Sequence, residues 1–190
     1  VRSACHSAQM ILLDINTFFA EKAGGIRTFY RAKISFFERQ ISHQYYLVYP
    51  GARRTIVSRL PSVTLAEFYG PQLSEDPGGY RWMLDYAGML ALIRKAKPDV
   101  IEVGDPWLTG LFCLAIKKLG LYRGLLACFY HSDPILTHVL PWAGRGHAQT
   151  WKRNLILRPL AALFYRLQRS YDLTVVSSQT MQDHLRDLSV

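Results

Sequence analysis

Three polar residues directly follow an unbroken apolar stretch of the chain. Residues 125–130 read Leu-Leu-Ala-Cys-Phe-Tyr, and His131, Ser132 and Asp133 come next, before Pro134. Such an apolar run is typical of a strand that is buried on both faces. Ligands of open α/β sheets bind outside the carboxyl ends of the strands, so these polar side chains are candidates for a site. The alternative is a histidine that bonds a carbonyl in the core, but the polar residues after it indicate that the strand has already emerged.

Two acidic residues mark a second strand end. Residues 100–103 read Val-Ile-Glu-Val and predict a strand that leads into Gly-Asp-Pro. Glu102 lies near the end of this strand and has to be paired or reach solvent. Three roles are open for it: to orient His131, to contact a ligand hydroxyl, or to form a structural ion pair with an arginine. Together with the side chains at 131 and 133, Glu102 and Asp105 are metal ligands by type, but their spacing is not that of a metal site and we expect no metal.

A pair of glycines separates the first predicted strand from its helix. Glycine lets backbone approach a ligand closely, and a helix N-terminus offers free N–H groups to an anion. Gly24 and Gly25 therefore predict contact with a phosphate, and Arg27 adds a positive charge in the first turn. The pair lacks the three spaced glycines of the dinucleotide fingerprint and the Gly-Lys-Ser/Thr of a P-loop. A simple turn is the alternative.

The hydrophobic periodicity predicts strands that alternate with helices. We expect strands over residues 9–15, 45–49, 100–103, 125–130 and 173–176, and helices over 26–41, 82–97, 107–119 and 179–188. Residues 52–79 look loop-like apart from a short strand over 55–57. A basic helical region over 148–171 is interrupted by Pro159, which suits the first turn of a second helix. This order predicts an α/β fold, a Rossmann-like parallel sheet with helices on both faces.

The composition indicates a globular domain with a basic surface. The 190 residues are 49% hydrophobic and 19% charged, with a formal net charge of +9. That balance favours a phosphate-rich partner, such as a nucleotide, nucleic acid or anionic lipid; the alternative is a basic but merely solvated surface. No apolar run is long enough to span a bilayer. Cys5, Cys113 and Cys128 have neither metal nor disulfide spacing, which fits a reducing compartment.

The positive charge is concentrated near the C-terminus. No acidic residue occurs from Pro134 to Tyr171, whereas six basic residues do: Arg145, Lys152, Arg153, Arg158, Arg166 and Arg169. At helical spacing, Leu160, Leu163, Phe164, Leu167 and Tyr171 share one face, opposite Arg158, Arg166 and Arg169. With Trp142 and Trp151 nearby, segment 145–169 predicts contact with an anionic membrane surface. The alternative is a helix packed on the sheet with a solvated basic face. We expect no nucleic acid partner, because no stacking platform of aromatic and basic residues is evident.

Several ordered pieces of the chain resemble a known enzyme family. They are Ile11-Leu12-Leu13 followed by Gly24-Gly25-Ile26-Arg27; residues 97–106, Lys-Pro-Asp-Val-Ile-Glu-Val-Gly-Asp-Pro; Tyr130-His131-Ser132-Asp133; and residues 171–178, Tyr-Asp-Leu-Thr-Val-Val-Ser-Ser. In this order they resemble the N-terminal half of a GT-B glycosyltransferase of family 4. Residues 58–63 and the long segment between 131 and 171 look most like members that glycosylate lipid acceptors, including the mannosyl-, glucosyl- and sulfoquinovosyl-diacylglycerol enzymes.

The resemblance implies an enzyme of two facing Rossmann-like domains. The first domain mainly holds the acceptor, and the second binds the nucleotide sugar, which is transferred with retained configuration and without a required metal or other cofactor. The chain stops at Val190, where the family continues into its second domain, and the family's Glu-x7-Glu motif is absent. Residues 1–190 are therefore expected to be a single N-terminal domain that is inactive by itself.

The resemblance also assigns roles to individual residues. Gly24, Gly25 and Arg27 would lie against the donor diphosphate, and His131 would be the catalytic residue beside the reaction centre. The predicted binders of acceptor or sugar hydroxyls are Glu102, Asp105, Ser132 and Asp133. The expected partners are a nucleotide-sugar donor and a lipid or glycan acceptor. The expected location is cytoplasmic, with peripheral attachment to the inner face of the plasma membrane as an extension. A self-contained phosphate- or nucleotide-binding α/β module remains the alternative.

Overall fold

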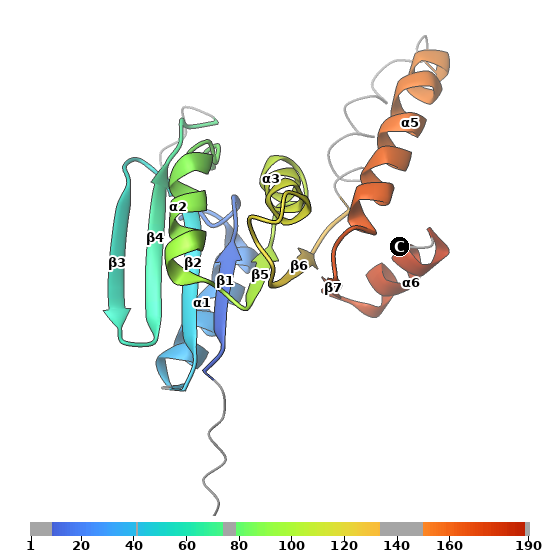
Figure 1. Cartoon of the computed structure of the whole chain (residues 1–190). Helices are drawn as coiled ribbons and strands as arrows, with labels where there is room; N and C mark the ends of the chain where they lie inside the picture. Colours follow the sequence, from blue (N-terminus) through green and yellow to red (C-terminus); the bar gives the residue numbers. More distant parts are fainter. Residues whose placement is uncertain (1–8, 41, 74–78, 134–149, 189–190) are drawn as a thin grey trace, which may run out of the picture. The chain divides into compact units, whose positions relative to one another are not determined.

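The protein forms two compact units, the first ending at Leu126 and the second beginning at Ala127 (Figure 1). The structure, a computed structural model, describes residues 9–40, 42–73, 79–133 and 150–188, without the side chains of 150–158. The predicted structure between Pro134 and Gly146 and the side chains of Cys5, Ile41, Trp142 and Arg145 lie outside this part, as do the side chains of Trp151, Lys152, Arg153 and Arg158. Within it, no helix combines the length and apolarity needed to cross a membrane.

Five strands of the first unit form a mostly parallel sheet in the order β3-β4-β2-β1-β5. They are β1 (Ile11–Ile15), β2 (Gln44–Gly51), β3 (Thr55–Leu60), β4 (Val63–Tyr69) and β5 (Val100–Val103). β1 pairs in parallel with both β2 and β5, and β2 pairs in parallel with β4. β3 alone among these strands runs antiparallel, as the first half of a hairpin with β4.

Helices cover both faces of this sheet, as predicted (Figure 1). The helices of the first unit are α1 (Gly24–Glu38), α2 (Tyr86–Ala96) and α3 (Leu108–Lys118). Alternate side chains of a strand point to opposite faces, and on β2 Tyr45 and Leu47 belong to the core under α1, where Tyr45 stacks on Phe37 with ring centroids 4.7 Å apart. Tyr46, on the other face, lines a groove together with Leu92 of α2.

The first unit departs from the sequence prediction by more than three residues in two places. Residues 63–69 form β4, where only loop was expected, because Pro61 lies just two residues before the strand and polar residues stand between its buried ones. α2 begins at Tyr86 rather than at Trp82, because the Asp85 side chain accepts a hydrogen bond from the Gly88 N–H at 2.8 Å and caps the helix there. The strand predicted over 100–103 has the observed limits.

β6 (Leu125–Tyr130) extends into the second unit, where it pairs in parallel with β7 (Leu173–Val176). Its helices are α5 (Thr150–Gln168) and α6 (Gln179–Asp187). Both strands have the predicted limits, and Ser178 caps α6 by accepting a hydrogen bond from the Met181 N–H at 3.3 Å. The predicted interruption at Pro159 is wrong, because that residue lies inside the continuous α5.

The two cysteines predicted to lie in the apolar core do so. Cys113 and Cys128 are buried free thiols in the middle of apolar elements, as expected for small core residues. In α5, however, the predicted apolar face is only partly covered. Phe164 and Tyr171 are buried, but Leu160 and Leu163 are 38% and 54% exposed.

Candidate functional site

A buried cluster of charged groups lies near the carboxyl ends of β1 and β5. Asp14 and Glu102 are register partners on these neighbouring strands. The Lys33 Nζ atom of α1 lies 2.7 Å from Asp14 Oδ2 and 2.9 Å from Glu102 Oε1. The Tyr45 hydroxyl donates a hydrogen bond of 2.7 Å to Asp14 Oδ2. Of the three roles open for Glu102, the structure therefore shows the ion pair, with a lysine in place of the expected arginine.

The protonation of this cluster follows from its burial. Asp14 is fully buried, and burial, together with the charge of Glu102, raises its pKa from 3.8 to about 7, against the opposing effect of Lys33. Burial alone lowers the pKa of Lys33, but the two carboxylates raise it by more, so the ammonium stays charged. Burial also raises the pKa of Tyr45 well above its usual value, which keeps this hydroxyl a donor.

Asp105 ties two loops together at the same edge of the sheet. It is 5% exposed, and its Oδ2 accepts a hydrogen bond from the Thr17 hydroxyl at 2.9 Å. Its Oδ1 accepts a second one from the Trp107 N–H at 2.9 Å. Both carboxylate oxygens are thus bonded within the protein and hold the start of α3 against the loop after β1. Its role in binding hydroxyls stays a prediction.

The glycine pair forms the first turn of α1, two residues earlier than the predicted start. Gly24 has a φ of +32°, and a Cβ added at Gly24 or Gly25 would meet no atom within 4 Å. Ala23 precedes the helix without a capping side chain, and the first turn holds no acidic residue. Within the described part of the chain, the N-terminus of α1 is therefore unobstructed, as binding of an anion to its N–H groups requires.

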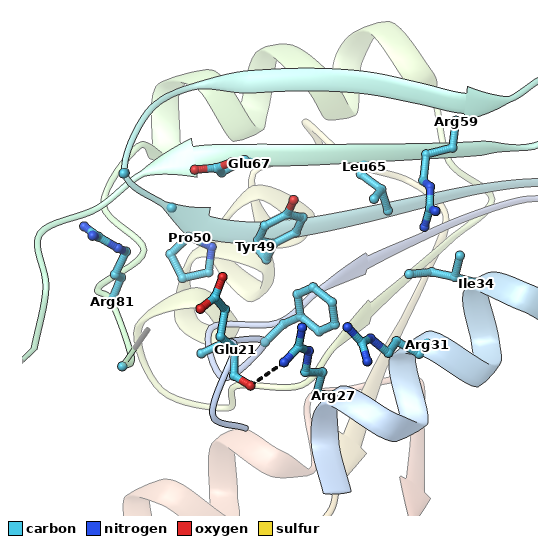
Figure 2. Close-up of a pocket in the computed structure, with 15 residues that line it drawn as sticks. Glu21, Arg27, Arg31, Ile34, Tyr49, Pro50, Arg59, Leu65, Glu67 and Arg81 are labelled. Carbon is cyan, nitrogen blue, oxygen red and sulfur yellow. Dashed lines mark hydrogen bonds between the residues drawn. The ribbon is translucent and has the colours of Figure 1, made fainter. Parts of the chain in front are cut away.

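A cavity of about 500 Å³ opens on the α1 side of the sheet (Figure 2). Its walls come from the loop after β1, from α1, from β2, β3 and β4, and from the segment after residue 78. Its charged lining consists of the guanidinium groups of Arg27, Arg31, Arg59 and Arg81 and the carboxylates of Glu21 and Glu67. We call it the arginine pocket. It takes in Arg27 but neither Gly24 nor Gly25.

The arginines of this pocket bond mainly to neutral groups. Arg27 donates to the backbone carbonyl of Glu21, and Arg81 donates to the Gly70 carbonyl at 2.9 Å. Arg59 reaches Glu38 only at 4.0 Å, with half of its side chain exposed. Arg31 has no hydrogen bond or ion pair to any residue that the structure describes. A carbonyl orients a guanidinium without cancelling its charge, so the pocket keeps an excess of positive charge.

The second unit holds the three polar residues that follow β6. Asp133 is 2% exposed, and its Oδ2 accepts a 2.7 Å hydrogen bond from the Tyr165 hydroxyl and lies 2.8 Å from His184 Nε2. Burial and the adjacent carboxylate raise the pKa of Tyr165, which keeps the phenol protonated. His131 and Ser132 are half-buried, and the carbonyl of His131 accepts a hydrogen bond from the Ser177 hydroxyl at 3.3 Å.

Sequence reasoning missed several of these residues. Tyr165 and His184 hold Asp133 from two helices, and no local motif indicates that contact. Lys33 stands among apolar helix positions, and its place three residues after Tyr30 on the buried face was a signal that it points inward. The i, i+4 spacing of Arg27 and Arg31 also puts both on one side of α1. Among the described residues, no group of three potential ligands has the arrangement of a metal site.

Comparison with known proteins finds a family model that matches most of the chain. The sequence model described as Glycosyltransferase Family 4 matches residues 23–190. No curated protein matches the chain. Among solved structures, the chain is similar to the crystal structure of α,α-trehalose 6-phosphate synthase from Burkholderia multivorans, with 17% identity and a TM-score of 0.46. That alignment covers 95% of this chain and 43% of the other, so the chain spans less than half the length of that protein.

Proposed function

This chain belongs to glycosyltransferase family 4, and on that premise we propose that it is the acceptor-side part of a sugar-transferring enzyme. The enzyme moves a hexose from a nucleotide-sugar donor to a lipid or glycan acceptor with retention of configuration and without a metal. The family match over residues 23–190 is the observation that carries this proposal. A donor-binding domain supplies the nucleotide site in this scheme.

The geometry of the first unit supports an acceptor role. A cavity of about 500 Å³ is of the size that holds small-molecule substrates. It lies beside the carboxyl end of β2, where open α/β sheets bind their ligands. The unobstructed N-terminus of α1 supports the further proposal that Gly24 and Gly25 face the donor diphosphate.

In this proposal His131 is the catalytic residue. It follows β6 directly, and the hydrogen bond from Ser177 to its carbonyl fixes the backbone at that point. An imidazole held at a strand end can orient a sugar hydroxyl or stabilise charge that develops during transfer. The proposed contacts to acceptor or sugar hydroxyls are made by Ser132, Glu102, Asp105 and Asp133. Where such an oxygen already bonds within the protein, the sugar hydroxyl donates to a lone pair that the protein partner leaves unused.

Replacement of His131 tests the enzyme assignment. In the intact protein, with nucleotide sugars and acceptors supplied as panels, nucleotide release and glycosylated product are measured together. His131→Ala is expected to lower kcat/KM by about 100-fold or more while the fold is retained. His43→Ala is the matched control, because His43 precedes β2 and so lies at the amino end of the strands, where it accepts a hydrogen bond from the Met10 N–H. Unchanged transfer by His131→Ala, or nucleotide binding without any transfer, would contradict the proposal and favour a binding module.

The second unit supports a proposed peripheral contact with the cytoplasmic face of a membrane. On α5, Leu163 is 54% exposed and Arg166, one turn later, is exposed as well. Exposed apolar and basic side chains on one helix are typical of segments that lie on anionic lipid. Flotation with anionic vesicles is expected to weaken in Leu163→Ser and Arg166→Gln but not in Arg94→Gln, which changes an exposed arginine of α2. Equal flotation with neutral and anionic vesicles would contradict this contact.

A further inference from the structure

We propose that the arginine pocket binds an oxyanion, such as a phosphate monoester or diester, that is carried by a polyhydroxylated acceptor. This inference rests on the proposed function and names the class of acceptor. It also moves Arg27 from the donor side, where the sequence analysis put it, to the acceptor.

The first argument is the uncompensated charge. Four arginines and two glutamates line the cavity, a formal excess of two positive charges. Within the described residues no carboxylate forms an ion pair with Arg27, Arg31 or Arg81, and the contact of Arg59 with Glu38 is long and exposed. Guanidinium groups are planar forks that match the oxygens of phosphate, and such charge-assisted hydrogen bonds are among the stronger ones.

The second argument is the distribution of charge inside the pocket. Figure 2 shows Arg27, Arg31 and Arg59 with their guanidinium groups toward the same end, reached from α1 on one side and β3 on the other. Glu21 and Glu67 lie toward Pro50, at the other end, and so does the fourth arginine, Arg81. An oxyanion is attracted to the arginine end and repelled from the carboxylates, which accept hydrogen bonds from donors such as sugar hydroxyls.

The neutral walls fit the rest of such a ligand. Phe19 and Tyr49 line the cavity with ring centroids 5.1 Å apart. Burial and the charge of Glu67 raise the pKa of Tyr49 against the smaller effect of Arg59, so its hydroxyl remains a neutral hydrogen-bonding group. The pocket therefore offers an anion site, acceptors for hydroxyls and an aromatic wall within one cavity.

The test presents the same phosphorylated headgroup as a soluble molecule and as part of a lipid. Binding of inositol 1-phosphate to the intact protein is measured by calorimetry, and binding of phosphatidylinositol vesicles by flotation, with myo-inositol, inorganic phosphate and phosphatidylcholine vesicles as comparisons. The variants are Arg31→Gln, Arg31→Lys and the control Arg39→Gln. Arg39 is exposed and follows the same helix, but it lies outside the pocket. Thermal unfolding of each variant verifies the fold.

We expect a phosphate-bearing probe to bind at least tenfold more weakly to Arg31→Gln, with an intermediate loss in Arg31→Lys and a change below twofold in Arg39→Gln. This pattern with inositol 1-phosphate indicates a soluble acceptor, and the same pattern with phosphatidylinositol vesicles alone indicates a lipid headgroup. The inference is overturned if neither probe binds, if myo-inositol or inorganic phosphate binds as tightly, or if Arg31→Gln behaves like the control. Competition by a nucleotide alone would also overturn it, because the pocket would then belong to the donor.

Nucleotide release from nucleotide sugars separates this inference from the proposed function. If nucleotide release does not depend on Arg31, the proposed glycosyltransferase function is supported and the anionic acceptor is rejected. Arg31-dependent binding in a protein that turns over no nucleotide sugar rejects the proposed function and keeps the oxyanion site.

Discussion

Helix α1 carries positive charge at two places that differ in how the charge is compensated. Lys33 points into the interior, where Asp14 and Glu102 hold its ammonium at 2.7 and 2.9 Å. Arg27 and Arg31, on the side of the same helix that faces β2 and β4, line a cavity and form no ion pair with any described residue.

The difference separates a charge that holds the fold from a charge that is open to a ligand. Removing one partner of a buried ion pair leaves an uncompensated charge and costs much stability. An exposed arginine without a partner contributes little to stability, and its charge remains available to an anion. Variants at the two places should therefore have effects on different measurements.

The largest expected effect on stability is that of Lys33→Met. Asp14 and Glu102 then lose their common cation in a buried setting, and we expect a loss of about 3–5 kcal/mol in the free energy of unfolding of the first unit. Hydrogen exchange of β1 and β5 amides measures this loss without assuming that the two units unfold together. Addition of Asp14→Asn to Lys33→Met should restore part of the stability. A loss below about 1 kcal/mol would mean that the cluster is not the structural element we describe.

The second prediction concerns pH. Burial raises the pKa of Asp14 from 3.8 to about 7, so between these values the folded chain retains a proton that the unfolded chain releases. The contribution of Asp14 to stability is therefore largest at low pH, falls as the pH rises from about 4 to about 7, and is constant above that. The stability of wild type relative to Asp14→Asn should fall across this window by a few kcal/mol at most, on the order of 1.4 kcal/mol per pKa unit. A difference that rises with pH would show that Lys33 dominates.

A smaller effect is expected in the second unit, where hydrogen bonds hold a buried carboxylate. Tyr165→Phe removes the hydroxyl that donates to Asp133 Oδ2 at 2.7 Å. A hydrogen bond to a charged group contributes about 1.5–3 kcal/mol, so β6 and β7 amides should exchange faster while β1 amides do not change. If His184 fully takes over, the variant will resemble wild type, and the hydroxyl is then dispensable.

The smallest effect on stability is that of Arg31→Gln. Since this side chain has no partner among the described residues, we expect the free energy of unfolding to change by less than about 0.5 kcal/mol. The same variant is expected to lose oxyanion binding, so binding and the free energy of unfolding should change independently. Destabilisation by more than about 1 kcal/mol in denaturant unfolding would place Arg31 with Lys33, among the residues that hold the fold.

Much of the fold could be predicted because short, mainly apolar strands have a strong local signal. The limits of β5, β6 and β7 match the predicted ones, since each is a short run of mostly apolar residues bounded by polar residues or turns. β4 was missed because its pattern, with a glutamate and a threonine between buried residues, becomes a strand only through its pairing with β2. Pro159 was misread because proline disfavours the interior of a helix, whereas α5 runs continuously through this residue.

The candidate site was harder to predict than the fold. Polar residues at strand ends were correctly located, but Asp105 and Asp133 are occupied by hydroxyl, imidazole or backbone donors of the protein itself. Sequence alone cannot distinguish a carboxylate that binds a ligand from one that holds a loop. The arginine pocket was missed as a unit because Arg59 and Arg81 join Arg27 and Arg31 only through the tertiary fold.

The antiparallel hairpin of β3 and β4 has one more consequence. Arg59 reaches the pocket from β3, an edge strand that pairs only with β4 in the first unit. A substitution at Arg59 changes one wall of the cavity and leaves the parallel strands in place. Under the proposed function, selection for a new ligand can therefore act at this edge strand, and a library centred on Arg59 is the natural place to begin re-engineering the pocket.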